Sequence, residues 1–396
     1  MLYKQAFIFA TMLALFLQPS WLLFTLIGMF VALLVIVLLL VKPLALHRYL
    51  LRVRGVQKEA VGRYISLKVL TSLRQAVDTS PAGSTGPIVA VREEQLSLLD
   101  LVRQQEGNQL LLGAPGTGKT MALRVYQYHA AEHSKALIFG PARIPVYVPM
   151  KDYSLYLKRL YQEVAPAMEE GEDHKGLDVD LLDFLHESDL PGMGYLRRYL
   201  KRLAAQGRLL LLCDGLNEVD GKYLSLVGDE LVSLMQKTNN RCVVTCREVD
   251  YREQRKLAQL VERGRVAQAV ISPLLPEQIH ACVERYIEQQ DKQWKHTAGQ
   301  IIQVIDRSRL RYHCTNPMML FLLLGIIDTI GVERGKQVDT RGRLLREAVG
   351  QLIEDERQRA RWQHLPPDAQ EVVRFLSEVA CAARWANDRG AIQLRV

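Results

Sequence analysis

Charged side chains are missing from the first part of this 396-residue sequence. From Gln5 to Val41 there is no Asp, Glu, Lys, Arg or His, although the rest of the chain is densely charged. The last part of this run, Trp21–Val41, consists of 21 mostly aliphatic residues. A helix needs about 20 such residues to cross the apolar core of a bilayer. We therefore predict a transmembrane anchor over residues 1–42.

The shorter uncharged run before it, Gln5–Gln18, allows three interpretations. It has 14 residues and ends at Pro19 and Ser20, so it forms the first span of a hairpin, an interfacial helix or the core of a signal peptide. No small-x-small cleavage site follows the run, which makes the signal peptide the weakest of the three. With one span or two, the positive-inside rule keeps the basic residues after Val41 in the cytoplasm. The expected location is the cell membrane, with the remainder of the chain facing the cytoplasm.

Several sequence patterns that would indicate other classes of protein are also absent. The six cysteines form no C-x-x-C pair and the nine histidines form no H-E-x-x-H, so zinc sites of these two kinds are excluded. Several of the cysteines stand in apolar runs, as small core residues with reduced thiols do. No L-S-G-G-Q signature occurs, which argues against ABC transport, and no tandem repeat follows the central region.

Basic residues are concentrated directly after the apolar run. Between Lys42 and Arg74 there are eight basic residues and one acidic residue, Glu59, so most of the net charge of +8 lies here. From Pro43 to about Val77 these residues mix with apolar ones, which predicts one or two amphipathic helices. Contact with anionic lipid and a solvated connector explain this pattern equally well. Because the positive-inside rule already accounts for the charge, no specific nucleic-acid binding is expected.

The rest of the chain alternates between strand-like and helix-like patterns. Residues 78–87 are a linker by composition and end a connector over residues 43–87. The alternation from about 109 to 272 predicts an α/β fold with a doubly wound parallel sheet. One expected strand, Ile144–Met150, contains two prolines, which either argue against a strand there or place it near a sheet edge. Other expected elements are a short extended piece and then a helix over 88–102, and helical patterns at 155–164, 177–185 and 195–205.

A complete phosphate-loop motif follows the apolar run Gln109–Leu112. The segment Gly113, Ala114, Pro115, Gly116, Thr117, Gly118, Lys119 and Thr120 matches G-x-x-x-x-G-K-[ST] and leads into a helical pattern. Glycines let the backbone approach a polyphosphate closely, and a helix N-terminus adds partial positive charge. Lys119 is expected to reach the β- and γ-phosphates, and the Thr120 hydroxyl to bind Mg²⁺. The alternative, a glycine-rich turn that contains a lysine by chance, is disfavoured by the full-length match. The motif predicts a P-loop NTPase with ATP or ADP and Mg²⁺ as cofactors.

Two further strands end in polar residues that suit the same chemistry. The run Leu209–Glu218 has five apolar residues and then Asp214, which at a strand end can hold Mg²⁺ directly or through water. Glu218 is a candidate general base that orients the attacking water. The alternative is a buried strand followed by a polar turn. The run Arg241–Arg247 predicts another strand, and Arg247 either senses the γ-phosphate or is a surface arginine.

These segments stand in the order and spacing of a NACHT domain, which the chain resembles from about residue 88 to 385. NACHT domains belong to the STAND class of signalling NTPases, relatives of the AAA+ group. The resemblance implies a slow ATP-hydrolysing switch, closed with ADP and open with ATP, that oligomerises on activation. It also implies a protein sensor or effector partner and, at family level, defence signalling. Besides the motifs above, the resemblance rests on Ile144–Asp152, Val244–Arg247, Ile271–Ile279 and Cys314–Leu320.

The resemblance further implies a division into domains and one more site residue. The nucleotide-binding domain would cover 88–272, a helical lid 273–335, and an apparently incomplete winged-helix subdomain 336–396. Pro317 would pack against the base, although a proline in the first turn of a helix is by itself a sufficient reason for that residue. Asn217 stands where the family commonly has an aspartate, and the missing negative charge leaves the rate of hydrolysis open.

Two other functions fit the same motifs. A membrane-tethered AAA+-like ATPase that remodels proteins would turn ATP over continuously. It would need an arginine finger acting in trans and pore-loop aromatic residues, and the sequence assigns neither. A structural tether with a vestigial nucleotide site is the third option, and the complete phosphate loop together with Asp214 and Glu218 argues against it.

Overall fold

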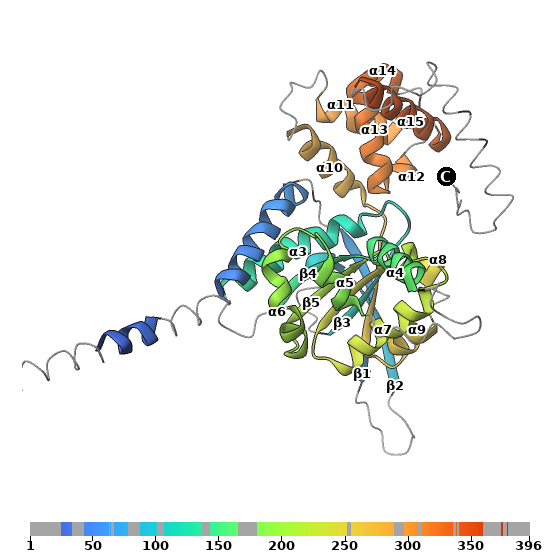
Figure 1. Cartoon of the computed structure of the whole chain (residues 1–396). Coiled ribbons are helices and arrows are strands. Elements are labelled where there is room, and N and C mark those ends of the chain that lie inside the picture. The colour runs from blue at the N-terminus through green and yellow to red at the C-terminus, as the bar shows by residue number, and fades with distance from the viewer. Residues whose placement is uncertain are drawn as a thin grey trace, which may run out of the picture. The chain divides into compact units, whose positions relative to one another are not determined.

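A seven-stranded sheet forms the centre of the computed structural model (Figure 1). Its strands stand in the order β2 (Ile88–Ser97), β1 (Lys68–Val77), β7 (Val266–Ile271), β3 (Asn108–Leu112), β6 (Arg241–Cys246), β5 (Leu209–Asp214) and β4 (Ile144–Pro149). The structure describes residues 25–33, 43–62, 64, 67–77, 88–100, 107–136, 143–164, 180–251, 255–288, 297–307, 311–335, 338, 340–358, 374 and 378.

Strand β3 runs parallel to both of its neighbours. Its residue Leu112 pairs with Cys246 of β6 and with Val270 of β7, so the carboxyl ends of these three strands meet at one edge of the sheet. The chain leaves β3 for β4 at the far edge, returns through β5 and β6, and then places β7 on the other side of β3. The strand order therefore reverses at β3, which is where ligands bind in open α/β sheets.

The α/β fold and the edge position of β4 confirm two sequence predictions. Leu110, Leu111 and Leu112 are buried, as expected of a strand in the middle of a parallel sheet that is covered on both faces. Strand β4 carries the two prolines and lies at the end of the strand order, where a missing N–H donor does least harm.

The prediction of amphipathic helices up to about Val77 is wrong for residues 68–77. These residues form β1, which pairs antiparallel with β2 over ten positions and also with β7. The extended piece expected at the start of 88–102 is the ten-residue strand β2, and the helix expected after it begins at residue 98. The mixture of apolar and basic residues up to Val77 is typical of a helix. Residues 68–77 are nevertheless a strand, because pairing with β2 and β7 supplies their backbone hydrogen bonds. Part of the expected connector thus belongs to the sheet.

The helices agree well with the predicted positions. The expected helical patterns at 155–164, 177–185 and 195–205 correspond to α4, α5 and α6. The bounds are α3 (Lys119–Ala136), α4 (Met150–Val164), α5 (Leu181–Glu187), α6 (Met193–Ala205), α7 (Leu224–Lys237), α8 (Glu248–Tyr251), α9 (Arg255–Glu262), α10 (Pro276–Glu288), α11 (Ala298–Arg307), α12 (Arg311–Cys314), α13 (Pro317–Ile330), α14 (Val332–Gly335) and α15 (Arg341–Gln358), with helices over 25–33 and 43–62 and the 3-10 turn η3 (Leu216–Glu218).

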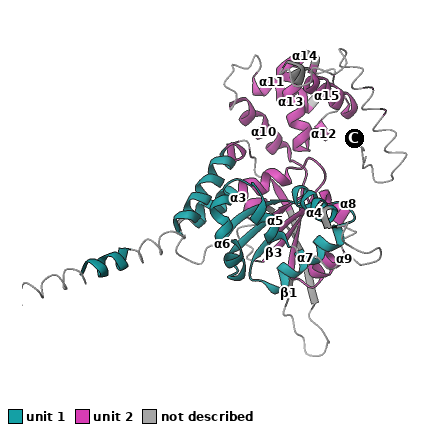
Figure 2. Cartoon of the chain, viewed as in Figure 1, with its two compact units in different colours: residues 1–58, 127–212, 220–242 teal, residues 59–126, 213–219, 243–396 magenta. Residues whose placement is uncertain are grey.

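Two compact units make up the chain, and they interleave in sequence (Figure 2). The first unit contains residues 1–58, 127–212 and 220–242, and the second contains 59–126, 213–219 and 243–396. The phosphate loop, the end of β5, most of β6 and the helices from α10 onward all belong to the second unit.

Both ends of the chain are described only in part. No helix among the described residues is long and apolar enough to cross a membrane. The predicted span Trp21–Val41 lies mostly outside the described residues, which include a helix at 25–33. Residues 273–335, for which a helical lid is predicted, contain α10 to α14. The predicted winged-helix subdomain contains α15, but only residues 374 and 378 are described after it.

The cysteines for which the structure gives a position are buried, and none of them forms a disulfide. They are Cys213, Cys242, Cys246, Cys282 and Cys314. Burial raises the pKa of the last four thiols to about 12. Thiols held so far from ionisation are poor nucleophiles, so the prediction that they act as small core residues is confirmed.

In the first unit, the helix at 43–62 is packed through one face. Leu46, Tyr49 and Leu50 are almost fully buried. The Tyr49 hydroxyl donates to the Pro145 carbonyl at 2.8 Å, and the Gln57 side chain donates to that of Gln127 at 3.1 Å. This helix is thus an integral part of its unit, held by apolar contact and by buried hydrogen bonds.

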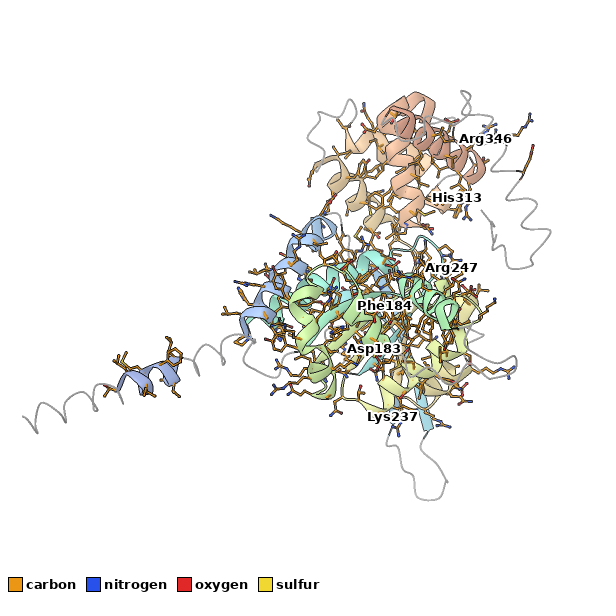
Figure 3. All side chains as sticks on the ribbon, in the orientation of Figure 1. Asp183, Phe184, Lys237, Arg247, His313 and Arg346 are labelled. Carbon is orange, nitrogen blue, oxygen red and sulfur yellow. The ribbon has the colours of Figure 1, made fainter. Side chains whose placement is uncertain are left out.

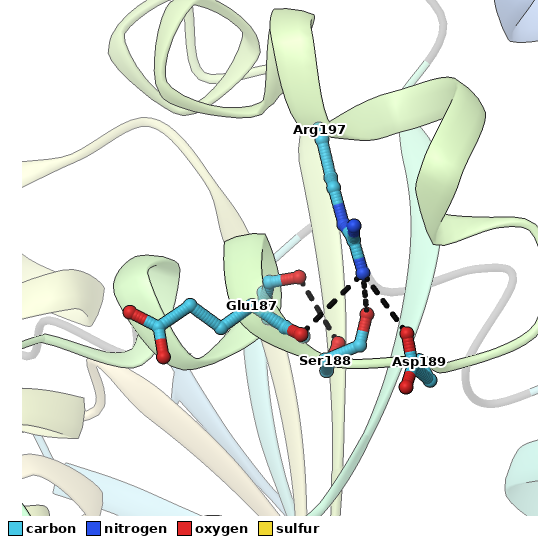
Figure 4. A network of polar contacts seen from close by, with 5 residues as sticks. Glu187, Ser188, Asp189 and Arg197 are labelled. Atoms are coloured by element: carbon cyan, nitrogen blue, oxygen red, sulfur yellow. Dashed lines mark hydrogen bonds and ion pairs between the residues drawn. The ribbon is translucent and has the colours of Figure 1, made fainter.

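Arg197 of α6 completes the C-terminal end of α5 in the same unit (Figure 4). Its guanidinium donates to the carbonyls of Ser188 at 2.7 Å and Glu187 at 3.4 Å, and pairs with Asp189 at 3.2 Å. The last carbonyls of a helix lack partners within it, so a cation in this position satisfies them and favours the negative end of the helix dipole. These contacts join α5 and α6.

Glu230 of α7 is a buried carboxyl group that holds the other end of α5. It accepts a hydrogen bond from the Tyr153 hydroxyl at 2.7 Å and another from the backbone N–H of Leu181. Burial, which disfavours the charged form, raises the pKa of Glu230 from 4.5 to about 7. The two hydrogen bonds lower the pKa of Glu230, but by less than burial raises it.

We expect Glu230→Gln to remove a pH dependence of stability. The pKa of Glu230 is higher in the folded than in the unfolded chain, so its stabilising effect is present below about pH 4.5 and is lost as the pH rises through about 7. Relative to the variant, the wild-type protein should lose on the order of 2 kcal/mol between pH 5 and pH 8. Urea unfolding at both pH values measures this difference. Glu284→Gln, at an exposed site on α10, is the control, and equal pH dependence in both variants would contradict the prediction.

Candidate nucleotide-binding site

The phosphate loop joins β3 to α3 through glycines that no other residue could replace without strain. Gly116 and Gly118 have φ of 79° and 91°, values that side chains with a Cβ rarely adopt. A Cβ on Gly113 would lie 2.8 Å from the Thr117 hydroxyl oxygen. That hydroxyl donates to the Ala114 carbonyl at 2.9 Å and closes the loop on itself. The sequence motif therefore folds into a tight loop between strand and helix.

Lys119 begins α3 and points back along the loop. Its ammonium donates to the carbonyls of Gly113 at 2.7 Å and Ala114 at 2.8 Å. An ammonium has three N–H donors, so a third is left for a ligand oxygen. Burial lowers the pKa of Lys119, as does the nearby Arg247, while nearby acidic groups raise it. The ammonium would be stabilised by a polyphosphate, which supplies negative charge beside it.

Asp214 ends β5 and is oriented by a buried threonine. Thr245 of β6 is completely buried and donates its hydroxyl hydrogen to the Asp214 carboxylate at 2.7 Å. The same hydroxyl oxygen accepts the backbone N–H of Gly215 at 2.8 Å. Gly215 has φ of 80°, which turns the chain sharply after the aspartate. One hydroxyl thus fixes both the carboxylate and the turn that follows it.

Glu218 and Arg247 follow the ends of β5 and β6. Glu218 lies in the turn η3, whose first hydrogen bond runs from the Glu218 N–H to the Gly215 carbonyl at 2.8 Å. Arg247 comes directly after β6 (Figure 3), and its backbone N–H donates to the Asn217 side chain at 3.2 Å. Asn217 therefore links the two strand ends. An aspartate could accept the same bond but would add a negative charge beside the site.

Helix α13 brings a third group of residues to the loop. Asn316 is its N-cap, accepting the Met318 N–H at 3.0 Å, and Pro317 stands in its first turn. This confirms the structural reason for the proline. The Asn316 side chain also donates to the Pro115 carbonyl at 2.9 Å, across 201 positions of sequence.

One cavity of 1120 Å³ in the second unit collects most of the predicted site residues. Its apolar part includes Leu67, Leu274, Tyr286 and Phe321, and the last two rings lie 5.9 Å apart. Gly113, Ala114 and Thr117 are outside its lining. The predicted residues that line it are Pro115, Gly116, Gly118, Lys119, Thr120, Asp214, Glu218, Arg247 and Pro317.

These residues fit a nucleoside polyphosphate with Mg²⁺. The glycine loop and Lys119 suit phosphate oxygens, and the hydroxyl and carboxylate oxygens of Thr120 and Asp214 are the hard ligands that Mg²⁺ prefers. The apolar part of the cavity suits a base and its sugar. Among the described residues no cluster of three His, Cys, Asp or Glu side chains could hold a metal ion alone.

Several residues at this site were not identified from the sequence. Thr245 is one polar residue inside the apolar strand β6, and only the pairing of that strand beside β5 gives it a role. Asn316 precedes a proline and an apolar helix, which is a recognisable N-cap signal, but its bond to Pro115 depends on the tertiary fold. Arg285 of α10 also lines the cavity and donates to the Tyr64 carbonyl at 2.7 Å.

Comparison with known proteins finds similarity in fold only. No family model matches the chain, and no curated protein matches it. Among solved structures, the Walker-type ATPase PABY2304 of Pyrococcus abyssi is 12% identical over 67% of this chain and 74% of that chain, with a TM-score of 0.38. Domain III of the Thermotoga maritima replication initiation protein DnaA is 15% identical over 62% and 89%, with a TM-score of 0.37.

A third similar structure is the Aeropyrum pernix ORC1 protein, solved in complex with DNA. It is 14% identical over 73% of this chain and 74% of that chain, with a TM-score of 0.37. Similarities at this level do not place the chain in any of these families. The chemistry of the site therefore rests on its own residues.

We expect Thr245→Val to weaken binding of Mg²⁺ and ATP together. Valine has nearly the same shape but cannot orient Asp214 or accept the Gly215 N–H. Loss of such a supporting hydrogen bond typically costs tenfold or more in metal affinity, so the affinity for Mg–ATP should fall about tenfold. Calorimetric titration with and without Mg²⁺ measures the effect. Thr245→Ser keeps the hydroxyl and should behave as wild type, and unchanged Mg–ATP affinity in the valine variant would exclude this role.

Proposed function

We propose that this protein is a P-loop ATPase that works as a slow nucleotide-operated switch of the NACHT type. The supporting observation is that the phosphate loop, the ends of β5 and β6, and the first turn of α13 all contribute to the lining of one cavity. Each of these segments carries a residue type that ATP binding or hydrolysis needs. The proposal extends the sequence resemblance and includes oligomerisation on activation and an unidentified protein sensor or effector.

In this proposal the residues at the phosphate end have separate tasks. The loop backbone and Lys119 bind the phosphates. Thr120 and Asp214 would hold Mg²⁺, which would neutralise phosphate charge. Thr245 keeps the Asp214 carboxylate in one orientation through the 2.7 Å hydrogen bond. The Asp214 carboxylate is then oriented before the nucleotide enters, which reduces the cost of ordering it.

Glu218 and Arg247 are assigned to the γ-phosphate. Glu218 is exposed at the cavity, where its carboxylate can accept a hydrogen from a water molecule and act as general base. Arg247 stabilises negative charge that a triphosphate has and a diphosphate lacks. A switch requires contacts that differ between its two nucleotides, because a ligand shifts an equilibrium only by its differential affinity.

We expect the purified full-length protein to retain ADP close to one molecule per chain and to hydrolyse added ATP slowly. Lys119→Ala should contain no nucleotide, because the loop loses its only side-chain cation. Glu218→Gln should bind ATP normally but release phosphate about a hundredfold more slowly, as is typical when a general base is removed. Extraction with chromatography identifies the nucleotide, and a phosphate assay follows turnover. Any shortened version of the protein used in this assay must retain residues 68–77, because they form β1 of the sheet.

Lys237→Ala, which changes an exposed lysine at the end of α7, is the control and should match the wild type. Rapid and steady turnover by a protein that carries no nucleotide would favour the AAA+-like remodelling ATPase instead of a switch. Normal turnover by Glu218→Gln would show that Glu218 is not the base. A wild-type protein that binds no nucleotide would refute the proposed function as a whole.

We also propose that the protein is anchored in the cell membrane, with the ATPase facing the cytoplasm. The uncharged run Gln5–Val41 supports this, and so do the basic residues that follow it. Residues 25–33 form a helix whose side chains are largely exposed, with Met29 at 71% and Phe30 at 67%. Large apolar groups exposed to this extent are stabilised in a lipid environment.

We expect the full-length protein to stay with the membrane fraction after alkaline carbonate extraction. A chain that lacks residues 1–42 should appear in the supernatant, because it has lost the uncharged segment. Removal of wild-type protein by carbonate would exclude an integral anchor. Removal by high salt alone would indicate that only the basic residues hold it at the membrane.

A further inference from the structure

The Asn316 side chain forms two hydrogen bonds that connect the start of α13 to the phosphate loop. Its oxygen accepts the Met318 N–H at 3.0 Å, and its nitrogen donates to the Pro115 carbonyl at 2.9 Å. The first bond caps the helix, whereas the second leaves the helix and holds the loop. One amide side chain therefore uses its acceptor and its donor for different tasks.

Two further contacts place α13 against the same part of the loop. The Met318 N–H is shared, since it also donates to the Gly116 carbonyl at 3.2 Å. A Cβ on Gly116 would lie 2.8 Å from the Asn316 side-chain oxygen and 2.8 Å from the Met318 Cβ. Gly116 is thus required here for close approach of the helix as well as for its positive φ. Both Gly116 and Met318 line the 1120 Å³ cavity.

These bonds constrain the backbone groups that would bind phosphate. In a trans peptide the C=O and the N–H point to opposite sides of the chain. Holding the Pro115 carbonyl against Asn316 therefore turns the N–H of Gly116 away from α13, and holding the Gly116 carbonyl does the same for Thr117. The Thr117 N–H in fact points to the Ala114 carbonyl within the loop, at 3.4 Å.

We propose that Asn316 is a positioning residue that couples phosphate-loop occupancy to the position of the lid helix α13. Its bond to Pro115 favours the loop conformation that accepts phosphate. By linkage, a nucleotide bound to the loop then stabilises the contact between the loop and the first turn of α13. This inference rests on the proposed function, because it assigns to that site the connection through which nucleotide reaches the lid.

The cap and the bond to the loop can be separated by substitution. Asn316→Ser keeps a hydroxyl that can cap α13, since serine is as good an N-cap as asparagine, but it is too short to reach Pro115. Asn316→Ala removes both functions. If only the cap matters, Asn316→Ser should bind nucleotide as the wild type does. If the bond to the loop matters, its nucleotide affinity should fall as it does in Asn316→Ala.

The test measures ADP and ATP affinity of the full-length protein by calorimetry, together with hydrogen exchange of the peptide that covers residues 316–320. Asn316→Ser should keep the wild-type melting temperature to within a few degrees without nucleotide. Its affinity for both nucleotides should be about fivefold weaker, the effect of one neutral hydrogen bond. Nucleotide should slow exchange in this peptide of the wild type, and the slowing should be lost in Asn316→Ser.

Lys119→Ala distinguishes failure of this inference from failure of the proposed function. If wild type binds nucleotide and Lys119→Ala does not, the site is functional and the coupling can be judged separately. Wild-type affinity and wild-type protection of residues 316–320 in Asn316→Ser would then overturn the role of Asn316. A loss of nucleotide affinity in Asn316→Ala but not in Asn316→Ser would also overturn it, because loss of the helix cap alone would explain that result.

Discussion

The parallel pairing of β3 with β6 and β7 is the constraint on which the site depends. It brings the carboxyl ends of these strands to one edge of the sheet, where the chain must turn after each of them. The turn after β3 is the phosphate loop and the residue after β6 is Arg247. Thr245, two residues earlier, lies where its hydroxyl reaches Asp214 of the next strand. A change of pairing would separate these groups by whole strand spacings of about 5 Å.

Four charged side chains dominate the electrostatics at the carboxyl ends of these strands. Lys119 and Arg247 supply positive charge, and Asp214 and Glu218 supply negative charge nearby. The lowered pKa of Lys119 shows that burial and Arg247 outweigh the two acidic residues there. Asn217 adds no charge, and it joins the two strand ends through the Arg247 N–H. The cations at this edge favour an anionic ligand.

The two units use polar side chains at helix ends in a similar way. In the first unit, Glu230 and Arg197 satisfy the two ends of α5, and in the second Asn316 satisfies the start of α13 and a loop carbonyl. Each side chain holds a helix terminus whose backbone groups have no partner within the helix. Such contacts position short helices more precisely than apolar packing does, because hydrogen bonds are directional.

The sequence alone determined the phosphate loop, the strand that ends in Asp214, the strand that Arg247 follows, and the edge position of β4. Those features depend on local rules: glycine at positive φ, apolar runs of strand length, and proline where no donor is needed. Tertiary structure decided that residues 68–77 form a strand and that Thr245 and Asn316 act at the site. Pairing of β1 with β7 overrides a helical periodicity, and the bond from Asn316 to Pro115 spans 201 positions. Contacts over such separations leave no periodic pattern in the sequence, because they depend on where the whole chain places each segment.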